Sequence, residues 1–181
     1  FEFDLYNILR ECHLLKRLND DQVQQLAESL PVEAIRADNL IFEQASQAQS
    51  FYFVLSGRVR LVLVDNHQEY EMGLLEEGDY FGQDALHAHG FNALQAVAAT
   101  NAIVAVLSHD HYRRLIRQFP LLENSFEAVY RSYRLGLQQD FSWRGPRESI
   151  QYISRIHPFF LFLKLLAPLF VLALSVVLWV F

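Results

Sequence analysis

The first 30 residues show the apolar spacing of helices. Four apolar side chains recur at the i, i+3, i+4, i+7 positions of one helix face: Leu5, Ile8, Leu9 and Cys12. This spacing predicts a helix over residues 4–18. A second helix follows, because Asn19 can cap it and Gln22 stands three residues later, as in a capping box. Pro31 ends this second helix.

Beyond the second helix the hydrophobic period changes to two, as in half-buried strands. Residues 51–55 and 58–64 are predicted strands, with Ser56–Gly57 as a tight turn between them. The polar residues 65–68 predict a turn into another strand. The apolar run 96–107 is rich in small residues and predicts one long strand covered on both faces. Closely spaced strands and turns favour a sandwich or a barrel-like roll.

Helical periodicity returns after this strand. Ser108 can cap a helix that ends before Pro120, and residues 121–141 predict another helix. The second of these helices carries an apolar stripe: Leu122, Phe126, Val129, Tyr130, Tyr133 and Leu137. Such a stripe needs a partner, which is the roll, a second copy of the chain or another protein. The pattern therefore predicts a mainly β fold with flanking helices.

The last 24 residues, 158–181, are predicted to span a membrane. From Phe159 onward this segment has 23 residues and one charge, Lys164. A helix of that length spans about 35 Å at about 1.5 Å per residue, and a hydrocarbon core is about 30 Å thick. We expect Lys164 to extend to the headgroups and Trp179 to mark the far interface.

The chain thus divides into a domain over 1–137, a linker over 138–157 and the span over 158–181. Arginines flank the predicted span on its N-terminal side: Arg144, Arg147 and Arg155. By the positive-inside bias this flank stays in the cytoplasm. We therefore expect a protein of the cytoplasmic (inner) membrane that crosses it once within these residues, with its domain facing the cytoplasm.

Charge and cysteine content narrow the classes of function. Residues 1–157 hold all 21 acidic residues and 14 of the 15 basic ones, so this part has a net charge near −7. A nucleic-acid-binding surface is usually basic, and this balance disfavours one. Cys12 is the only cysteine, so the chain cannot form an internal disulfide. A reducing compartment suits that composition.

Motifs of catalysis and metal binding are absent. The chain has no Gly-x-Ser-x-Gly, Walker loop or Cys/His nucleophile pairing, and we expect no enzyme activity. His109 and His111 lie on different faces of their predicted helix, with no cysteine or carboxylate to complete a zinc site, so we expect no metal. Arg113, Arg114 and Arg117 form a basic patch on the same helix, either solvated or in contact with acidic lipid or a partner.

Several stretches, in order, resemble the cyclic-nucleotide-binding domain superfamily. "LLKRLNDDQVQQLAESL" resembles its opening helices, and "AIVAVLSHDHY" resembles its last strand and the capped helix that follows. Between them, "FYFVLSGRVRLVLVDNHQEYEMGLLEEGDYFGQDAL" is similar to its strand-Gly-strand stretch, hairpin and Gly-Asp-x-Phe-Gly turn. The resemblance covers about residues 5–137, and one usual glycine is missing from the turn at 44–50. It implies a β-roll, a double-stranded β-helix or jelly roll, with flanking helices.

The resemblance also implies a ligand-binding cassette, here residues 81–93. In the family, a Phe-Gly-Glu turn leads into a helix whose backbone N–H groups hold the cyclic phosphate. An acid binds the ribose 2′-OH, and an arginine pairs with the phosphate. Here Gln83 stands at the acid position and Asn92 at the arginine position. The candidate ligand-binding residues of this degenerate cassette are Phe81, Gly82, Gln83, Asp84, Ala85, Asn92 and Ala93.

The missing arginine weakens the case for a nucleotide. Loss of one partner of a buried charged pair costs roughly 2 to 5 kcal/mol, which weakens binding roughly 30- to several-thousand-fold. Asp84 adds a negative charge, and we hypothesise that its carboxylate occupies the N-terminus of the cassette helix itself. Gln83 and Asn92 can still hydrogen-bond a neutral or weakly charged ligand. Protonated His87 and His89 are alternative anion-binding groups.

We predict a membrane-anchored, non-catalytic domain that senses a signal or binds another protein, without a cofactor. Many members of the family end in a DNA-reading helix-turn-helix, and here the apolar segment takes that place, which again argues against nucleic acid. Two alternatives remain. One is a working receptor for cyclic AMP or cyclic GMP. The other is an accessory subunit, bound to other membrane-protein subunits or to further copies of this chain.

Overall fold

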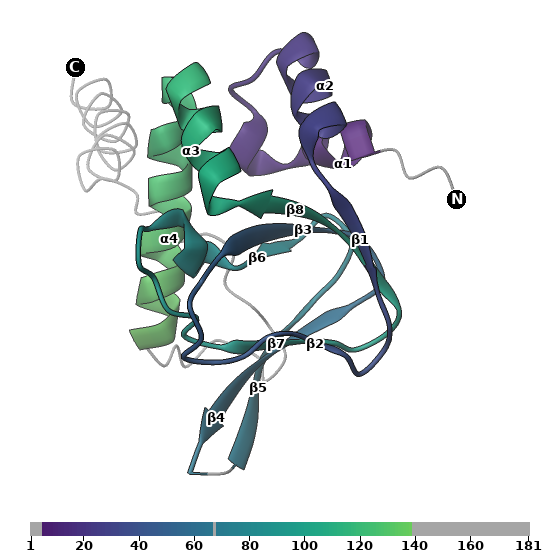
Figure 1. The fold of residues 1–181 in the computed structure, drawn as a ribbon, viewed down its shortest axis with the longest axis vertical. Coiled ribbons are helices and arrows are strands. Elements are labelled where there is room, and N and C mark those ends of the chain that lie inside the picture. The colour runs from purple at the N-terminus through teal and green to yellow at the C-terminus, as the bar shows by residue number, and fades with distance from the viewer. Residues whose placement is uncertain (1–4, 67, 139–181) are drawn as a thin grey trace, which may run out of the picture.

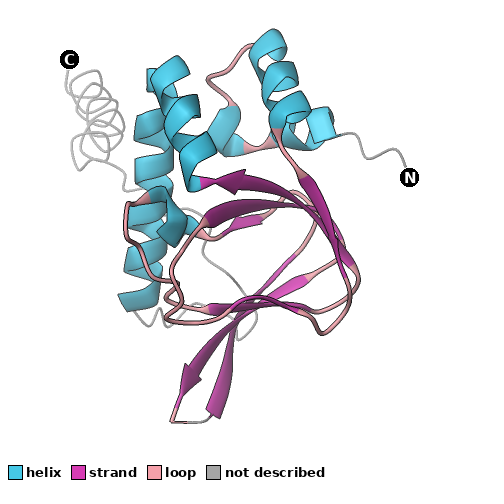
Figure 2. Cartoon of the chain, in the orientation of Figure 1, coloured by secondary structure: helices cyan, strands magenta, loops and turns pink. Residues whose placement is uncertain are grey.

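A computed structural model describes residues 5–66 and 68–138, which fold into two β-sheets with the helices gathered on one side (Figures 1 and 2). The first sheet has the strand order β1 (Val32–Ile35), β8 (Ala102–Ser108), β3 (Ser50–Ser56), β6 (Tyr80–Phe81). The second sheet has the order β2 (Leu40–Phe42), β7 (Gln95–Ala98), β4 (Val59–Asp65), β5 (Gln68–Leu75). Paired strands are antiparallel throughout both sheets. This arrangement confirms the predicted roll with flanking helices.

Strand β3 is buried on both faces, and it separates two hydrophobic cores. Its side chains alternate between the faces, as the period of a strand requires. Phe51, Phe53 and Leu55 belong to the core that the first sheet shares with the helices. Val54 lies in the core inside the roll, and Tyr52 packs against that core. The apolar run at 51–55 therefore holds the helices on the outside of the roll.

Helices α1 (Leu5–Glu11) and α2 (Asp20–Ser29) lie above the first sheet in Figure 1. The capping box at the start of α2 is confirmed, since the Asn19 side chain accepts from Gln22 N–H and the Gln22 side chain accepts from Asn19 N–H. The prediction of one helix over 4–18 was wrong. The backbone turns extended at Cys12, and a short 3-10 helix, η1 (His13–Leu15), buries Leu14 and Leu15 instead.

The prediction of a single strand over 96–107 was also wrong. The chain turns after β7 and enters the other sheet as β8. Polar groups hold this turn, because Thr100 Oγ1 accepts from Arg58 N–H and Asn101 Oδ1 accepts from Ala37 N–H. Gly57 fits against it: a Cβ there would lie 2.2 Å from the Asn101 carbonyl oxygen, and the residue has φ +82°. The turn thus connects the two sheets of the roll.

After β8, α3 (His109–Gln118), the short η3 (Pro120–Leu122) and α4 (Glu123–Gln138) form a helical hairpin beside the roll. Ser108 caps α3 as predicted. The apolar stripe of α4 finds its partner in the same chain. Phe126 and Val129 enter the outer core, and Tyr133 and Leu137 pack against the core of the roll.

The predicted linker and membrane span lie outside the described residues. Among residues 5–66 and 68–138, no helix combines the length and the apolar character that crossing a bilayer requires. The membrane segment at 158–181 stays a prediction from sequence.

Candidate functional site

The cassette starts from the short strand β6, which pairs with the middle of β3. Phe81 is fully buried, and its ring stacks on that of Tyr52 with 4.8 Å between centroids and 11° between planes. Phe42 of β2 adds a third ring, 5.9 Å from Phe81. These contacts fix the start of the cassette to both sheets of the roll.

The Phe-Gly turn that follows is confirmed, and it requires glycine. Gly82 has φ +80°, in the left-handed region. A Cβ at this position would lie 2.5 Å from the carbonyl oxygen of Ser50 and 3.1 Å from the Tyr52 ring. Glycine therefore supplies both a conformation and a close approach that a larger residue would strain. The chain then enters a short 3-10 helix, η2 (Gln83–Leu86), all four residues of which are buried.

Asp84 lies at the centre of the cassette and is 5% exposed. Its Oδ2 accepts two hydrogen bonds of 2.9 Å, one from the backbone N–H of Ala93 and one from the hydroxyl of Tyr133 on α4. Its Oδ1 lies 3.9 Å from Nη1 of Arg134. Asp84 lies in the first turn of η2, as hypothesised, but the hydrogen bonds of its carboxylate go to other parts of the chain. It binds the returning arm of the cassette and the last helix instead.

Tyr133 is the residue that sequence reasoning missed, since its spacing marked it only as part of an apolar stripe. Burial raises the pKa of Tyr133 above its ordinary value, and the neighbouring Asp84 charge raises it further. The phenol therefore keeps its proton and serves as a donor to the carboxylate. No pattern in the sequence predicts this hydrogen bond, because the two residues are 49 positions apart.

Asn92, at the position where the resemblance implies an arginine, is 4% exposed and bound to the turn after β2. Its Nδ2 donates to Ser46 Oγ over 2.9 Å. Its backbone N–H donates to the Ser46 carbonyl, and its own carbonyl accepts from Ala45 N–H. Asn92 thus replaces a cation by a neutral link between the cassette and residues 44–50. Ala45 has φ +60°, a conformation that favours glycine, in the turn that lacks the family's usual glycine.

The two histidines of the cassette are exposed. The ring of His87 lies over Tyr130, with centroids 3.9 Å apart, and its Nε2 is 3.4 Å from Oε2 of Glu127. His87 therefore faces α4 and a carboxylate. His89 has φ +62°. Their role as anion-binding groups stays a prediction, and the contacts of His87 do not favour it.

The remaining candidate residues of the cassette are at least partly buried, and the two histidines of α3 lie apart. Gln83 and Ala85 are buried in η2, and Ala93 contributes the N–H that Asp84 accepts. His109 and His111 do not meet: Nδ1 of His109 contacts the Ala85 carbonyl over 2.7 Å, and Nε2 of His111 is 3.3 Å from Ser29 Oγ. Within the part of the chain that the structure describes, no three His, Cys, Asp or Glu residues are placed to hold a metal ion.

The geometry leaves the cassette with one buried carboxylate, whose two hydrogen-bond donors are neutral and whose charged neighbour in the described part of the chain is Arg134, 3.9 Å away. The backbone N–H of Ala93 could hold an anion if it were free, but here it donates to the Asp84 carboxylate. A second anion near this carboxylate would be repelled, because charges interact strongly where water is excluded.

Comparison with known proteins identifies the fold. Residues 32–119 match the sequence profile of the family described as "Cyclic nucleotide-binding domain". The chain is 27% identical over 150 residues to "cGMP-dependent protein kinase, isozyme 1" of Drosophila melanogaster. That match covers 80% of this chain and 20% of the kinase, so the chain spans about a fifth of that relative.

Solved structures agree. The Thermus thermophilus catabolite activator protein has a TM-score of 0.63 and 28% identity, over 69% of this chain and 61% of the other. The regulatory subunit of a cAMP-independent protein kinase A from Trypanosoma brucei, as a triple mutant bound to cAMP, has a TM-score of 0.60 and 22% identity. That similarity covers 75% of this chain and 51% of the other. The family resemblance on which the cassette prediction depends is therefore confirmed.

Proposed function

Since residues 32–119 constitute a cyclic nucleotide-binding domain, we propose that the chain uses this fold as a non-catalytic regulatory or protein-interaction module rather than as a nucleotide receptor. One observation carries the proposal. Oδ2 of Asp84 accepts hydrogen bonds from the N–H of Ala93 and from the hydroxyl of Tyr133. The protein thus supplies its own anion to the cassette.

The energetics favour this assignment. A cyclic phosphate entering beside Asp84 would meet a like charge at a buried site, without the compensating arginine. The neutral Asn92 is already bonded to Ser46. Absence of one partner of a buried charged pair costs roughly 2 to 5 kcal/mol, or roughly 30- to several-thousand-fold in affinity. Displacing Asp84 from Ala93 and Tyr133 adds to that cost.

A structural relative offers a precedent for a domain of this fold that works without the nucleotide. The Trypanosoma brucei subunit belongs to a kinase described as cAMP-independent, and its cAMP-bound form is a mutant with three substitutions, one of which introduces an arginine. We propose that the present cassette is degenerate in a comparable way. Restoring an arginine at Asn92 is the corresponding change.

We further propose that the module is anchored to a membrane. Support comes from the sequence alone: 23 consecutive residues from Phe159 carry a single charge, and arginines precede them. On this proposal residues 158–181 cross the cytoplasmic membrane once, with the domain in the cytoplasm. Its partners are then other membrane-protein subunits or further copies of itself.

A second candidate function is a working cyclic-nucleotide receptor. The family match favours it, because Phe81 and Gly82 still form the turn that opens the cassette. In that case Asp84 moves away from Ala93 when the ligand enters, and another group supplies the positive charge. Arg134, 3.9 Å from Asp84, is the nearest such group among the described side chains.

Extraction in mild detergent, followed by identification of co-purifying chains, tests the proposed function. A stoichiometric complex with another membrane protein supports an interaction module, and within it the accessory-subunit alternative. An isolated chain that binds cyclic AMP or cyclic GMP at micromolar concentration supports the receptor and contradicts the proposal. The control is a Gly82→Ala variant, in which the distorted cassette should lose nucleotide binding if the receptor assignment is right.

A further inference from the structure

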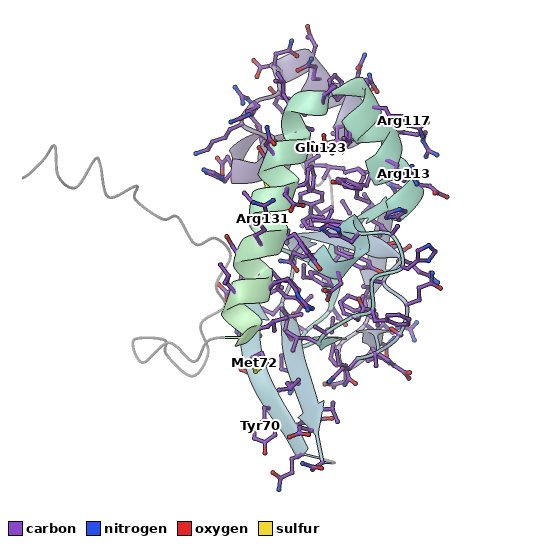
Figure 3. The ribbon with its side chains drawn as sticks, turned by 90° about the vertical axis from the view of Figure 1, so that its left-hand side faces the viewer. Tyr70, Met72, Arg113, Arg117, Glu123 and Arg131 are labelled. Carbon is purple, nitrogen blue, oxygen red and sulfur yellow. The ribbon has the colours of Figure 1, made fainter. Side chains whose placement is uncertain are left out.

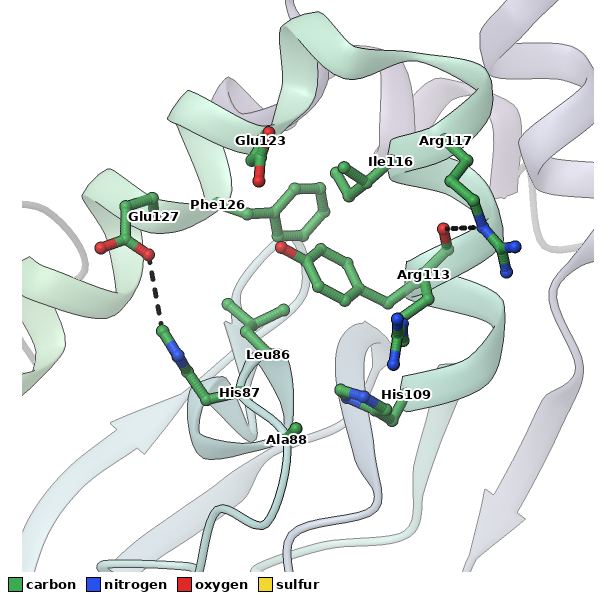
Figure 4. A pocket seen from close by; sticks show the side chains of 11 residues that line it. Leu86, His87, Ala88, His109, Arg113, Ile116, Arg117, Glu123, Phe126 and Glu127 are labelled. Carbon is green, nitrogen blue, oxygen red and sulfur yellow. Dashed lines mark hydrogen bonds and ion pairs between the residues drawn. The ribbon is translucent and has the colours of Figure 1, made fainter.

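A cavity lies between α3, α4 and the end of η2, where Leu86, His87 and Ala88 of the cassette form one of its walls (Figure 4). Its volume is about 490 Å³, within the range of about 300 to 1,000 Å³ that is usual for small-molecule sites. Leu86, Ile116 and Phe126 give it an apolar interior. The groups that bond Asp84 and Asn92 do not line this cavity.

The two helices give the cavity walls of opposite charge. Arg113 and Arg117 come from α3, and Glu123 and Glu127 come from α4 (Figures 3 and 4). With neutral histidines these four charges sum to zero, so the cavity carries a dipole rather than a net charge. A ligand of one sign would be repelled by one wall, whereas a dipolar ligand matches both.

Two of these charges have no ionic partner in the described part of the chain. Glu127 is engaged by Arg131 Nε at 2.8 Å and by His87, and Arg117 Nε donates to the Arg113 carbonyl. Neither the Arg113 guanidinium nor the Glu123 carboxylate forms an ion pair among residues 5–66 and 68–138. They stand on opposite walls and do not neutralise each other.

Aromatic rings complete the cavity. Phe126 is fully buried, and its ring contacts that of Tyr112 edge to face, 5.1 Å between centroids. Burial, and after it the charges of Glu123 and Glu127, raise the pKa of Tyr112 to about 12. The Tyr112 phenol therefore stays protonated at neutral pH, next to the acidic wall. Aromatic faces beside a carboxylate suit a cationic ammonium group and an apolar side chain.

We propose that this cavity binds a zwitterionic ligand with an apolar body, of the size of a dipeptide. Its carboxylate pairs with Arg113, whose planar guanidinium can bind a carboxylate through two hydrogen bonds. Its ammonium group pairs with Glu123 on the opposite wall. Its side chain lies against Ile116 and the ring of Tyr112, which are partly exposed in the cavity. This inference does not depend on the proposed function of the cassette, because Arg113 and Glu123 take no part in the contacts of Asp84.

Calorimetric titration of the full chain tests the proposal, with the dipeptides Ala-Phe and Ala-Leu and free phenylalanine as probes. We expect saturable binding of at least one free zwitterion. Acetylating its amino end or amidating its carboxyl end should weaken binding about tenfold or more, because a charged hydrogen-bonded pair is lost. Absence of binding by all three probes, or equal binding of the blocked forms, overturns the proposal.

Single substitutions test which wall binds the carboxylate of the ligand and which binds its ammonium group. Arg113→Gln should weaken the free dipeptide about tenfold and abolish its advantage over the carboxyl-amidated form. Glu123→Gln should abolish its advantage over the acetylated form. Arg114→Gln is the matched control, because Arg114 is exposed on the same helix and does not line the cavity. An Arg114→Gln effect as large as that of Arg113→Gln would contradict the assignment.

Discussion

The hydroxyl of Tyr133 donates a 2.9 Å hydrogen bond to Oδ2 of Asp84, and so joins the last described helix to the centre of the cassette. The same oxygen accepts from Ala93 N–H. One carboxylate thus connects η2, the returning arm of the cassette and α4. Any ligand that displaces Asp84 must also break its hydrogen bond to Tyr133, which couples the cassette to α4.

Removing this phenol should destabilise the domain. Tyr133→Phe leaves a nearly buried carboxylate oxygen with one donor instead of two, and we expect a loss of about 1 to 3 kcal/mol in the free energy of unfolding. Tyr70→Phe is the control, because the Tyr70 hydroxyl donates to Gln68 on the exposed hairpin, where water can replace it. Urea unfolding of the two variants measures the difference. Equal stabilities would show that the bond to Asp84 contributes nothing.

Replacing Gly82 and Gly78 by alanine should distinguish the cost of a positive φ from the cost of a steric overlap. Both have positive φ, +80° and +89°, so alanine at either position should cost roughly 1 to 2 kcal/mol. Only Gly82 also has backbone in the way, at 2.5 Å, whereas a Cβ at Gly78 meets nothing within 4 Å. Gly82→Ala should therefore lower the melting temperature clearly more than Gly78→Ala. A similar loss of melting temperature in both variants would mean that the backbone around Gly82 shifts to accommodate a Cβ.

The turn after β2 should gain stability from glycine. Ala45 has φ +60°, and Ala45→Gly removes the strain of a left-handed alanine at the expense of a more flexible unfolded chain. We expect a net gain of about 0.5 to 1 kcal/mol. Ala37→Gly, at an exposed residue without positive φ, should instead lose about 0.4 to 1 kcal/mol. Thermal unfolding that gives both changes the same sign would contradict this account.

Cys12 should make stability depend on pH in the alkaline range. Burial raises the pKa of its thiol more than the hydrogen bonds of the Leu14 and Leu15 backbone lower it, and the resulting pKa is about 11 instead of 9.0. Below pH 9 the thiol is protonated in both states. Between about pH 9 and 11 only the unfolded chain ionises, so the free energy of unfolding falls with rising pH, by about 3 kcal/mol.

Cys12→Ala is the reference for that measurement, because Tyr112 also titrates in the upper part of the same range. The wild type should lose more stability than Cys12→Ala between pH 9 and 11. Curves that run parallel would show that the thiol is not protected from ionisation by the fold.

Local signals in the sequence predicted much of the fold. The capping box at Asn19 and Gln22 and the Phe81–Gly82 turn depend on residues close in sequence, and both are confirmed. The break at Thr100 was missed, because its hydrogen bonds come from Arg58 and Ala37 in other parts of the chain. Apolar small residues on both sides made the run appear continuous.

The partner of Asp84 could not be predicted for a related reason. A carboxylate near the start of a helix normally binds the free N–H groups of its own first turn. Here η2 is only four residues long, and Ala93 and Tyr133 offer better-placed donors. Residue chemistry pointed to Asp84, and tertiary structure decided which groups it binds.

Calorimetric titration with cyclic AMP and cyclic GMP tests the central claim, that Asp84 occupies the cassette in place of a phosphate. The wild type is compared with the variant Gln83→Glu, Asp84→Leu, Asn92→Arg, which restores the acid and the arginine and removes the internal anion. We expect no saturable binding by the wild type at micromolar concentration, and at least about 30-fold tighter binding by the variant. Micromolar affinity of the wild type for either nucleotide would contradict the account.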